Sequence, residues 1–335
     1  MTETSVIALY ENCIPVKGAR RSIICDLFYQ TYMFIPNVLY EILTVHRHRT
    51  VGDVKAAYGG QHDAAIESYF AEVIARGYAQ ECTPEEAGRF PALNPHWERP
   101  ELITNAILDI DPQDPYDLSK AIKELVSVGC KAVQVRIFNE ASPAFLGSVL
   151  TLFDRTPIEH IELLLKHSPL LEDQALLALC RPFPRVNAIT LHSGPETPPT
   201  DYNRAGLTVT RVAREIRSSS HCGVINPAFF NVTLENFLES HRFNSCLHKK
   251  ISIDVHGQVK NCPSMEKSYG HISETRFLDV LDLEGFQDLW TVTKDQVDVC
   301  RQCEFRYICT DCRVYTSPEG KPSKCSYDPF TATWA

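Results

Sequence analysis

The sequence lacks a long apolar run, an excess of basic residues and the motifs of several enzyme classes. No stretch reaches the ~20 apolar residues that a membrane helix needs. The formal net charge is −9, which argues against a general nucleic-acid binder, since such proteins carry a basic face. No P-loop, nucleophile elbow or HExxH motif is present. We therefore expect neither a membrane nor a nucleic acid as partner.

The start of the chain also lacks the features of a signal peptide. Residues 1–5 have neither a basic beginning nor an apolar core. We therefore expect a cytoplasmic location. Thirteen cysteines in such a chain indicate metal ligands or redox groups and not a disulfide framework, because the cytoplasm is reducing.

The N-terminal segment, 1–85, predicts a small domain of strands followed by helices. Three segments have strand-like composition: 6–10, 21–26 and 32–35. Gly18 supplies a turn between the first two. Helical patterns follow, and we expect Asn37 and Thr50 to cap the first two helices and Gly77 to end the third, which covers 63–76. Three strands and three helices are the outline of a winged helix.

A linker and a repetitive α/β region come next. Residues 79–100 are rich in Pro, Glu and Gly, and we assign the linker itself to 86–100. Between 101 and 240, predicted strands begin near 103, 131, 158 and 186, so they recur at a nearly constant interval. A regular βα repeat predicts a parallel sheet with right-handed crossovers, either open or forming an incomplete (βα) barrel. Further strands are expected at 207–212 and 223–225.

Seven of the cysteines gather in a predicted C-terminal domain, residues 241–335. Their spacing is Cys246-x10-Gly257-x4-Cys262, then Cys300-x2-Cys303-x5-Cys309-x2-Cys312, then Cys325. The alternating residues 251–255 predict a hairpin that brings Cys246 and Cys262 together. Each CxxC pair places two thiolates on one tight turn, as a tetrahedral metal requires. The spacing alone leaves zinc and iron–sulfur clusters open.

The cysteine pattern resembles the SPASM domain, the C-terminal auxiliary-cluster module of many peptide-modifying radical S-adenosylmethionine enzymes. The resemblance lies in residues 254–263 (DVHGQVKNCP) and 300–309 (CRQCEFRYIC). One departure is that two residues separate Cys309 and Cys312, where the family usually has three.

This resemblance implies two [4Fe–4S] clusters. Cluster II would take Cys300, Cys303, Cys309 and Cys325. Cluster I would take Cys246, Cys262 and Cys312, and its fourth ligand is missing from the motif. Three residues are candidates for that position: His241, His248 and Cys222. The position could also stay open for a substrate.

The radical centre of that superfamily is absent from the sequence. Radical members carry CxxxCxxC just after the first barrel strand, and this chain contains no such motif. The first predicted strand leads into residues 111–115 (DPQDP), a short acidic turn without room for a cluster loop. The second ends at 138–141 (FNEA) and not in a glycine-rich turn. We expect a radical-SAM-like partial barrel without the radical cluster and without bound S-adenosylmethionine.

The N-terminal domain adds a more specific resemblance. Residues 37–78 resemble the winged-helix elements that bind a leader peptide as an added strand. With 18–22 (GARRS) and 34–37 (FIPN), the three-part order resembles the SPASM-domain maturases of grasp-with-spasm systems, which are encoded beside an ATP-grasp ligase and similarly lack the radical motif. The resemblance implies a maturation protein for a ribosomally made peptide that binds the precursor and acts with the ligase.

Whether the chain catalyses a reaction is left open at this point. One alternative is an active redox or radical-type peptide-modifying enzyme. Another is a zinc-binding interaction protein, since the same thiolates would suit zinc.

Overall fold

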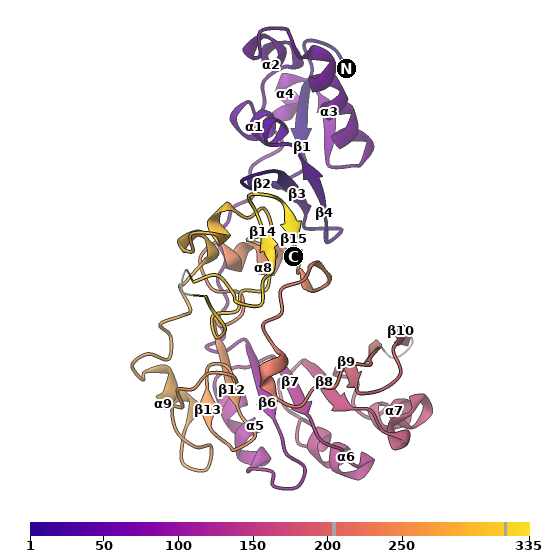
Figure 1. Ribbon diagram of the computed structural model, residues 1–335, viewed down its shortest axis with the longest axis vertical. Coiled ribbons are helices and arrows are strands. Elements are labelled where there is room, and N and C mark those ends of the chain that lie inside the picture. Colours follow the sequence, from indigo (N-terminus) through magenta and orange to yellow (C-terminus); the bar gives the residue numbers. More distant parts are fainter. Residues whose placement is uncertain (203–205, 318–319) are drawn as a thin grey trace. The chain divides into compact units, whose positions relative to one another are not determined.

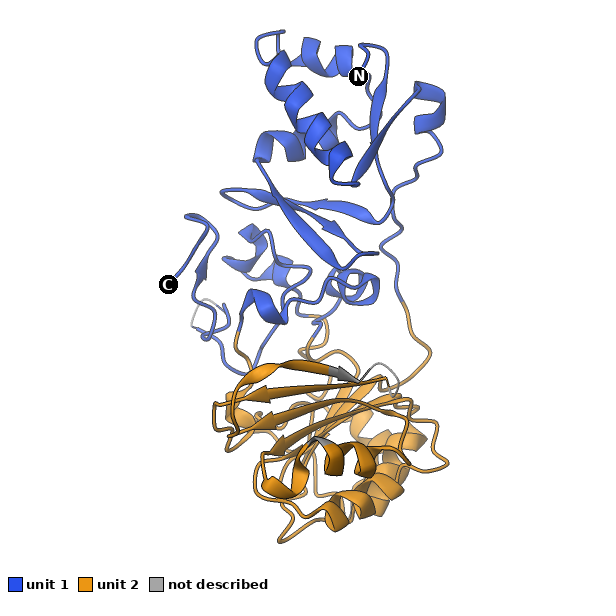
Figure 2. Ribbon diagram, turned by 90° about the vertical axis from the view of Figure 1, so that its right-hand side faces the viewer, with its two compact units in different colours: residues 1–97, 225–245, 292–335 blue, residues 98–224, 246–291 orange. Residues whose placement is uncertain are grey.

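The computed structural model describes residues 1–202, 206–317 and 320–335 (Figure 1). They form two compact units (Figure 2). Unit 1 contains residues 1–97, 225–245 and 292–335, and unit 2 contains residues 98–224 and 246–291. The chain therefore leaves and re-enters both units. The predicted domains, with limits at 85, 100 and 240, stay a prediction.

Unit 1 begins with two small antiparallel sheets. β1 (Val6–Leu9) pairs with β5 (Ala79–Cys82). The second sheet has the order β2 (Cys13–Val16), β3 (Ser22–Asp26), β4 (Thr31–Ile35). The prediction that Gly18 turns the first strand into the strand near 21–26 was wrong, because Gly18 lies between β2 and β3. The sequence analysis missed β2, which contains Pro15, a residue without a backbone N–H.

Three helices follow the second sheet: α1 (Asn37–Val45), α2 (Val51–Ala57) and α3 (Asp63–Ala75). The Thr50 cap is confirmed, since Thr50 and Asp53 form a reciprocal capping box. Gly77 follows α3 with a φ of 77°, which confirms the predicted stop. The Asn37 cap was wrong. Pro36 precedes α1, and the Asn37 amide donates instead to the carbonyl oxygens of Gly18 and Ala19.

The sheet β2–β3–β4 is covered on both faces, and every residue of β3 is buried. Ile24 belongs to a core formed with apolar residues of α1, α2 and α3. Ile23 and Cys25 belong to a second core with Phe305 and Ile308 of the C-terminal segment. The sheet therefore lies between the helices and the cysteine-rich part of unit 1.

Short elements complete unit 1. They are α4 (Pro84–Ala87), η3 (Pro227–Phe229), α8 (Leu234–Ser240), η4 (Lys294–Gln296), η5 (Cys300–Gln302), β14 (Tyr327–Asp328) and β15 (Thr333–Trp334). β5 and α4 occupy the first part of the run of biased composition at 79–100, and α4 ends just inside the linker predicted at 86–100. Thr83 caps α4 in a capping box with Glu86.

Unit 2 is built on an eight-stranded, mostly parallel sheet. Its order is β10 (Thr197–Tyr202), β11 (Leu207–Val212), β9 (Val186–His192), β8 (His160–Lys166), β7 (Ala132–Ile137), β6 (Asn105–Asp109), β12 (Lys250–Ile253), β13 (Val259–Lys260). Only the outermost strands β10 and β13 are antiparallel to their neighbours. The predicted parallel sheet is confirmed in its open form. The predicted strand at 223–225 was wrong, since β10 already occupies that edge of β11.

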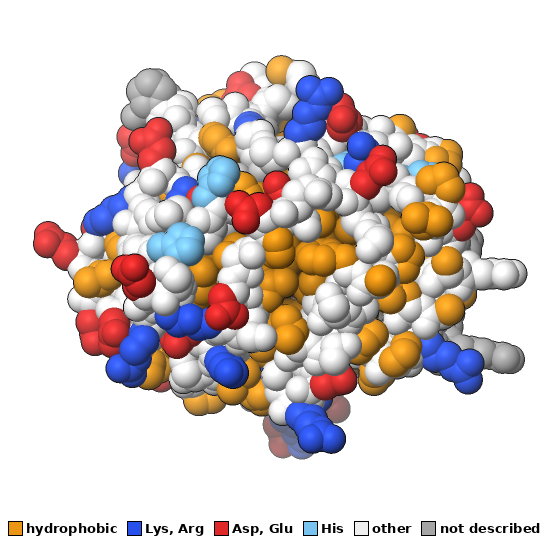
Figure 3. Space-filling view, turned by 90° about the horizontal axis from the view of Figure 1, so that it is seen from below, with side chains coloured by type: hydrophobic (Ala, Val, Ile, Leu, Met, Phe, Trp, Pro, Cys, Tyr) orange, Lys and Arg blue, Asp and Glu red, His pale blue; other side chains and the backbone are white. Residues whose placement is uncertain are grey.

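Three crossover helices lie together on one side of this sheet (Figure 2). They are α5 (Leu118–Ser127), α6 (Pro143–Thr151) and α7 (Asp173–Cys180). α9 (Phe277–Leu281), η1 (Pro169–Leu171) and η2 (Ser219–His221) complete the unit. Seen from below, unit 2 exposes apolar side chains in a hollowed band (Figure 3). None of the helices in the described residues has the length and apolar character to cross a bilayer.

Candidate metal centre

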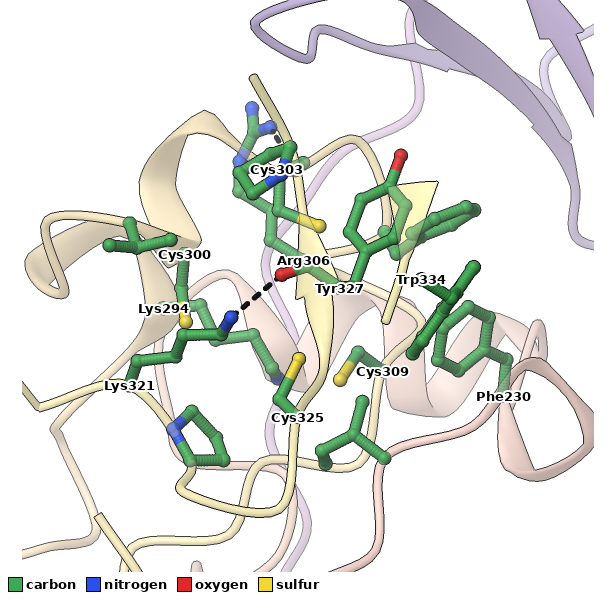
Figure 4. A pocket seen from close by; sticks show the side chains of 15 residues that line it. Phe230, Lys294, Cys300, Cys303, Arg306, Cys309, Lys321, Cys325, Tyr327 and Trp334 are labelled. Carbon is green, nitrogen blue, oxygen red and sulfur yellow. Dashed lines mark hydrogen bonds between the residues drawn. The ribbon is translucent and has the colours of Figure 1, made fainter. Parts of the chain in front are cut away.

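Four cysteines line one pocket of unit 1: Cys300, Cys303, Cys309 and Cys325. Their sulfur atoms turn toward a common space (Figure 4). The pocket is narrow, with a cavity volume of about 30 Å³. The structure thus brings together the four cysteines assigned from the sequence to cluster II. We call this site the thiol pocket.

Two consecutive turns place three of these thiols. The N–H of Cys303 donates to the carbonyl oxygen of Cys300 at 2.9 Å, and the N–H of Cys309 donates to that of Phe305, also at 2.9 Å. Phe305 and Ile308 between them are buried in the second core of unit 1. Burial of these apolar residues fixes the turns, so the adjoining cysteines are positioned by the core.

A buried carboxylate anchors the same turns to the N-terminal sheet. Glu304 is fully buried and pairs with Arg21 at 2.8 Å and with the Tyr327 hydroxyl. The N–H of Ala19 donates to the carbonyl oxygen of Gln302 at 2.7 Å. The loop between β2 and β3 is therefore bonded to the segment that carries Cys300 and Cys303.

Positive charge lines the thiol pocket. Lys294 is 4% exposed and lies 3.7 Å from Asp311. Lys321 donates to the carbonyl oxygen of Tyr327 at 2.7 Å (Figure 4). Both lysines border the pocket together with Arg306. Sequence analysis did not find these lysines, since they belong to no motif.

Burial raises the pKa of three pocket thiols, those of Cys300, Cys303 and Cys309, so they stay protonated in the metal-free protein. It raises the pKa of Cys300 to about 11, with a smaller contribution from Asp311. It raises the pKa of Cys309 to about 12, against the lowering effect of Lys294. The pKa of Cys303 rises as well, although the N–H of Phe305 lowers it. Metal ligation requires thiolates, so loading the pocket would release protons.

The same four thiols could in principle serve a zinc ion or an iron–sulfur cluster. In the described part of the chain, no three or more His, Cys, Asp or Glu side chains are arranged to hold one metal ion. A zinc ion with bonds of about 2.3 Å draws its thiolates close together. An iron–sulfur cluster has an inorganic core of its own, so its thiolates lie farther apart around that core.

The predicted cluster I ligands are divided between the units. Cys246 and Cys262 belong to unit 2, and Cys312 belongs to unit 1. The predicted hairpin is present as β12 and β13. Burial, with a smaller contribution from Cys246, raises the pKa of Cys262 to about 12. Their role as ligands, with that of Cys312, stays a prediction.

The candidates for the missing ligand have different surroundings. His241, in unit 1, stacks on Tyr307 with ring centroids 3.7 Å apart, and it does not line the thiol pocket. His248 packs edge-on against Trp290 in unit 2. Cys222, also in unit 2, accepts a hydrogen bond from Arg136 at 2.9 Å.

Three of the scattered cysteines are expected to react slowly. Burial raises the pKa of Cys13 and Cys130 to about 12 and that of Cys180 to about 11. At pH 8, roughly one thiol in four is ionised at the ordinary pKa of about 8.5, against about one in 10⁴ at pKa 12. We expect iodoacetamide to label Cys13 and Cys130 about 10³-fold more slowly in the native than in the urea-unfolded protein, as measured by peptide mass spectrometry.

The same shifts predict lower stability at alkaline pH. Above about pH 8.5 the unfolded chain ionises these thiols while the folded chain keeps them neutral. The contribution to stability is therefore complete below pH 8.5 and declines as pH rises toward the folded pKa values. Equal iodoacetamide labelling rates in the native and unfolded proteins would contradict the raised pKa values on which both predictions rest.

Comparisons with known proteins assign no family. No protein-family model matches the chain, and no curated protein matches it. Among solved structures, the chain is similar to SuiB of Streptococcus suis, crystallised bound to the precursor peptide SuiA. The similarity covers 95% of this chain and 99% of that chain, with 9% sequence identity and a TM-score of 0.38. At these values it assigns neither a fold nor an activity to the chain.

Proposed function

We propose that this chain is a maturation protein for a ribosomally made peptide and that it holds a [4Fe–4S] cluster in the thiol pocket. The observation that carries the proposal is the convergence of Cys300, Cys303, Cys309 and Cys325 on one space lined by lysines. A four-thiolate [4Fe–4S] cluster carries a net charge of about −2. Lys321 and Lys294, the latter paired with Asp311, place positive charge at the pocket wall.

The precursor peptide would bind along the outer edge of β4. Among the described strands, β4 pairs with β3 alone, so its other edge presents unpaired backbone groups. The turn before it exposes Phe28 and Tyr29, and Phe34 on β4 is 46% exposed. An added strand gains affinity from main-chain hydrogen bonds and specificity from alternate side chains.

The peptide edge and the thiol pocket lie in the same unit and share aromatic contacts. The ring centroid of Phe34 is 5.8 Å from that of Phe305. Phe305 borders the thiol pocket and follows Cys303 by two residues. A peptide on β4 would thus bind beside the cluster-bearing turn, and the chain would present it to a partner ATP-grasp ligase, in keeping with the family resemblance.

Anaerobic purification followed by metal analysis tests the cluster. We expect a brown protein that absorbs near about 400 nm and contains iron and acid-labile sulfide in equal amounts, at least about four of each per chain. A colourless protein that contains zinc would replace this proposal with the zinc-binding alternative.

N-methylated peptides test strand addition. Along an added strand, alternate residues direct their N–H groups toward the sheet. We expect a fluorescently labelled precursor to lose affinity at least about tenfold when three alternate residues are N-methylated, since each lost hydrogen bond is worth about 1 kcal/mol. Methylation of the intervening three residues is the matched control and should weaken binding much less. Equal effects in fluorescence anisotropy would exclude pairing with β4.

A further inference from the structure

A second cavity of unit 1 lies along β2, the strand at the opposite edge of its sheet from β4. Its volume is about 350 Å³, and sites for small molecules usually have about 300–1,000 Å³. Four parts of the chain line it: β2 with the loop before it, the end of α1, residues 91–95, and α8 with the residues that follow it. It shares no lining residue with the thiol pocket. We call it the β2 cavity.

Buried side chains and a hydrogen bond fix the walls of the β2 cavity. Phe237 and Leu238 of α8 line it, and both are buried in the second core of unit 1. The segment 91–95 is held at its start, because the carbonyl oxygen of Phe90 accepts a hydrogen bond from the Arg47 guanidinium at 2.8 Å. The cavity is therefore formed before a ligand binds, and little ordering would oppose binding.

The backbone of β2 directs two residues toward this cavity and away from the sheet. The N–H of Leu27 donates to the carbonyl oxygen of Asn12 at 2.9 Å, so the backbone of Asn12 faces β3. Backbone groups alternate in direction along an antiparallel strand. Ile14 therefore faces β3 as well, whereas Cys13 and Pro15 direct their backbone groups to the outer edge.

This outer edge of β2 offers acceptors but no free N–H donor. The N–H of Cys13 already donates to the carbonyl oxygen of Tyr10 at 2.9 Å, and Pro15 has no N–H. The carbonyl oxygens of Cys13 and Pro15 point outward with them. An added strand needs both donors and acceptors, so it cannot pair here as it can at β4. A small ligand that donates hydrogen bonds fits this edge better.

Two side chains of opposite charge line the β2 cavity, and neither is neutralised within the protein. Glu11 lies in the loop before β2, and Arg47 follows α1. In the part of the chain that the structure describes, no base pairs with Glu11 and no acid pairs with Arg47. The guanidinium group suits a carboxylate, and the carboxylate suits an ammonium group.

The remaining wall combines one further acceptor with apolar side chains. His241 lines the cavity, and its Nδ1–H donates to the carbonyl oxygen of Phe237 at 2.8 Å, so Nε2 of the neutral ring is an acceptor. The apolar lining includes Leu9, Ile14, Leu43, Leu93, Phe237 and Leu238. A ligand that matches the whole wall therefore carries an ammonium group, a carboxylate and an apolar body. An α-amino acid with an apolar side chain combines these three groups.

We propose that the β2 cavity binds a free apolar α-amino acid, such as leucine. Arg47 binds its carboxylate, and Glu11 binds its ammonium group together with the outward carbonyl oxygens of β2. The side chain of the ligand packs among the apolar residues of the wall. This role goes beyond the function proposed above, since it requires neither the cluster nor the precursor peptide.

Isothermal titration calorimetry of the full chain with L-leucine and its blocked derivatives tests the ligand class. We expect L-leucine to bind with a dissociation constant below about 1 mM. N-acetyl-L-leucine lacks the ammonium group and L-leucinamide lacks the carboxylate, so each should bind at least about tenfold more weakly. L-serine, which lacks the apolar body, should also bind more weakly. Absence of leucine binding at about 10 mM, or equal affinity for either blocked derivative or for serine, would overturn the proposal.

Two charge variants test the assigned contacts through a crossed change in preference. E11Q should bind leucine at least about tenfold more weakly and lose the preference for leucine over N-acetyl-leucine, while its preference over leucinamide remains. R47Q should lose the preference over leucinamide and keep the other. The matched controls are E41Q and R49Q, which change exposed residues in and after α1 outside the lining of this cavity and should bind as the wild type does. Loss of folding cannot produce the crossed pattern, and unchanged affinity in E11Q and R47Q would contradict the assignment.

A third variant fills the cavity without removing a charge. Ala92 lines the β2 cavity and is exposed, so a larger side chain there need not enter a buried core. A92W is expected to abolish leucine binding while urea unfolding of the protein stays unchanged. A92S is the matched control and should bind as the wild type does. If A92W binds leucine with wild-type affinity, the amino acid binds elsewhere and the β2 cavity is not its site.

Discussion

Replacement of Cys303 by serine is expected to remove about four irons per chain and to lower the free energy of unfolding of the loaded protein by more than about 3 kcal/mol. Cys303 closes the first turn of the thiol pocket and adjoins the second core of unit 1. Ligand binding energy at such a site is folding energy, because the unfolded chain does not preform the site. Iron content and anaerobic urea unfolding measure the two effects.

Cys25→Ser is the matched control for this change. Cys25 lies in the same core and is fully buried. It belongs to neither predicted cluster and does not line the thiol pocket. We expect C25S to cost about 1–3 kcal/mol, because a hydroxyl replaces a buried apolar thiol, while the iron content stays unchanged. Equal iron in C303S and C25S would contradict the assignment of Cys303 as a ligand.

The parallel sheet could be predicted because its pattern is local. Each βα repeat places an apolar strand and an amphipathic helix within one short and regular period, and right-handed crossovers then order the strands. The thiol pocket could be expected for a similar reason. Cys300 and Cys303 share one turn, Cys309 lies on the next, and only Cys325 arrives from a distant segment.

Pairings between distant segments could not be predicted. β1 pairs with β5, although the whole second sheet and the three helices α1, α2 and α3 lie between them in the chain. No property of residues 6–9 distinguishes that partner from the nearer strand at 22–26. Residues 246–291 join unit 2 between two segments that belong to unit 1. Asn37 has the composition of a cap, but tertiary hydrogen bonds to Gly18 and Ala19 took its amide.

Some charged side chains near the thiols could be anticipated from the sequence pattern, and others could not. Asp109 and Arg136 each follow a run of strand-forming residues, and their separation in the chain matches the βα period, so a cross-strand ion pair was readable. Lys294 begins the short helix η4 and Lys321 lies outside the helices and strands, and neither periodicity nor a motif marks them. Cys222 precedes the cysteine-rich segment and belongs to no motif, so the sequence offers it only as one of three candidates for the missing ligand. Its hydrogen bond from Arg136 becomes visible only in the tertiary structure.

Loss of the Arg136 charge is expected to be the most destabilising single change in unit 2. Asp109 is 2% exposed, and both its oxygens accept hydrogen bonds from Arg136. R136L leaves this carboxylate buried without its cation, which typically costs about 3–5 kcal/mol. Urea unfolding of the metal-free protein measures the loss. Trp97 and Trp334 should first be replaced by Phe, so that the buried Trp290 reports on unit 2.

The double variant D109L/R136L separates charge from packing. Removing both partners eliminates the uncompensated charge, so we expect it to be more stable than R136L by at least about 2 kcal/mol. The exposed pair Lys131–Glu159, with N and O atoms 2.8 Å apart, is the control, and E159Q should cost less than about 1 kcal/mol. If D109L/R136L is as unstable as R136L, the apolar contacts of the arginine, and not its charge, hold this part of the sheet.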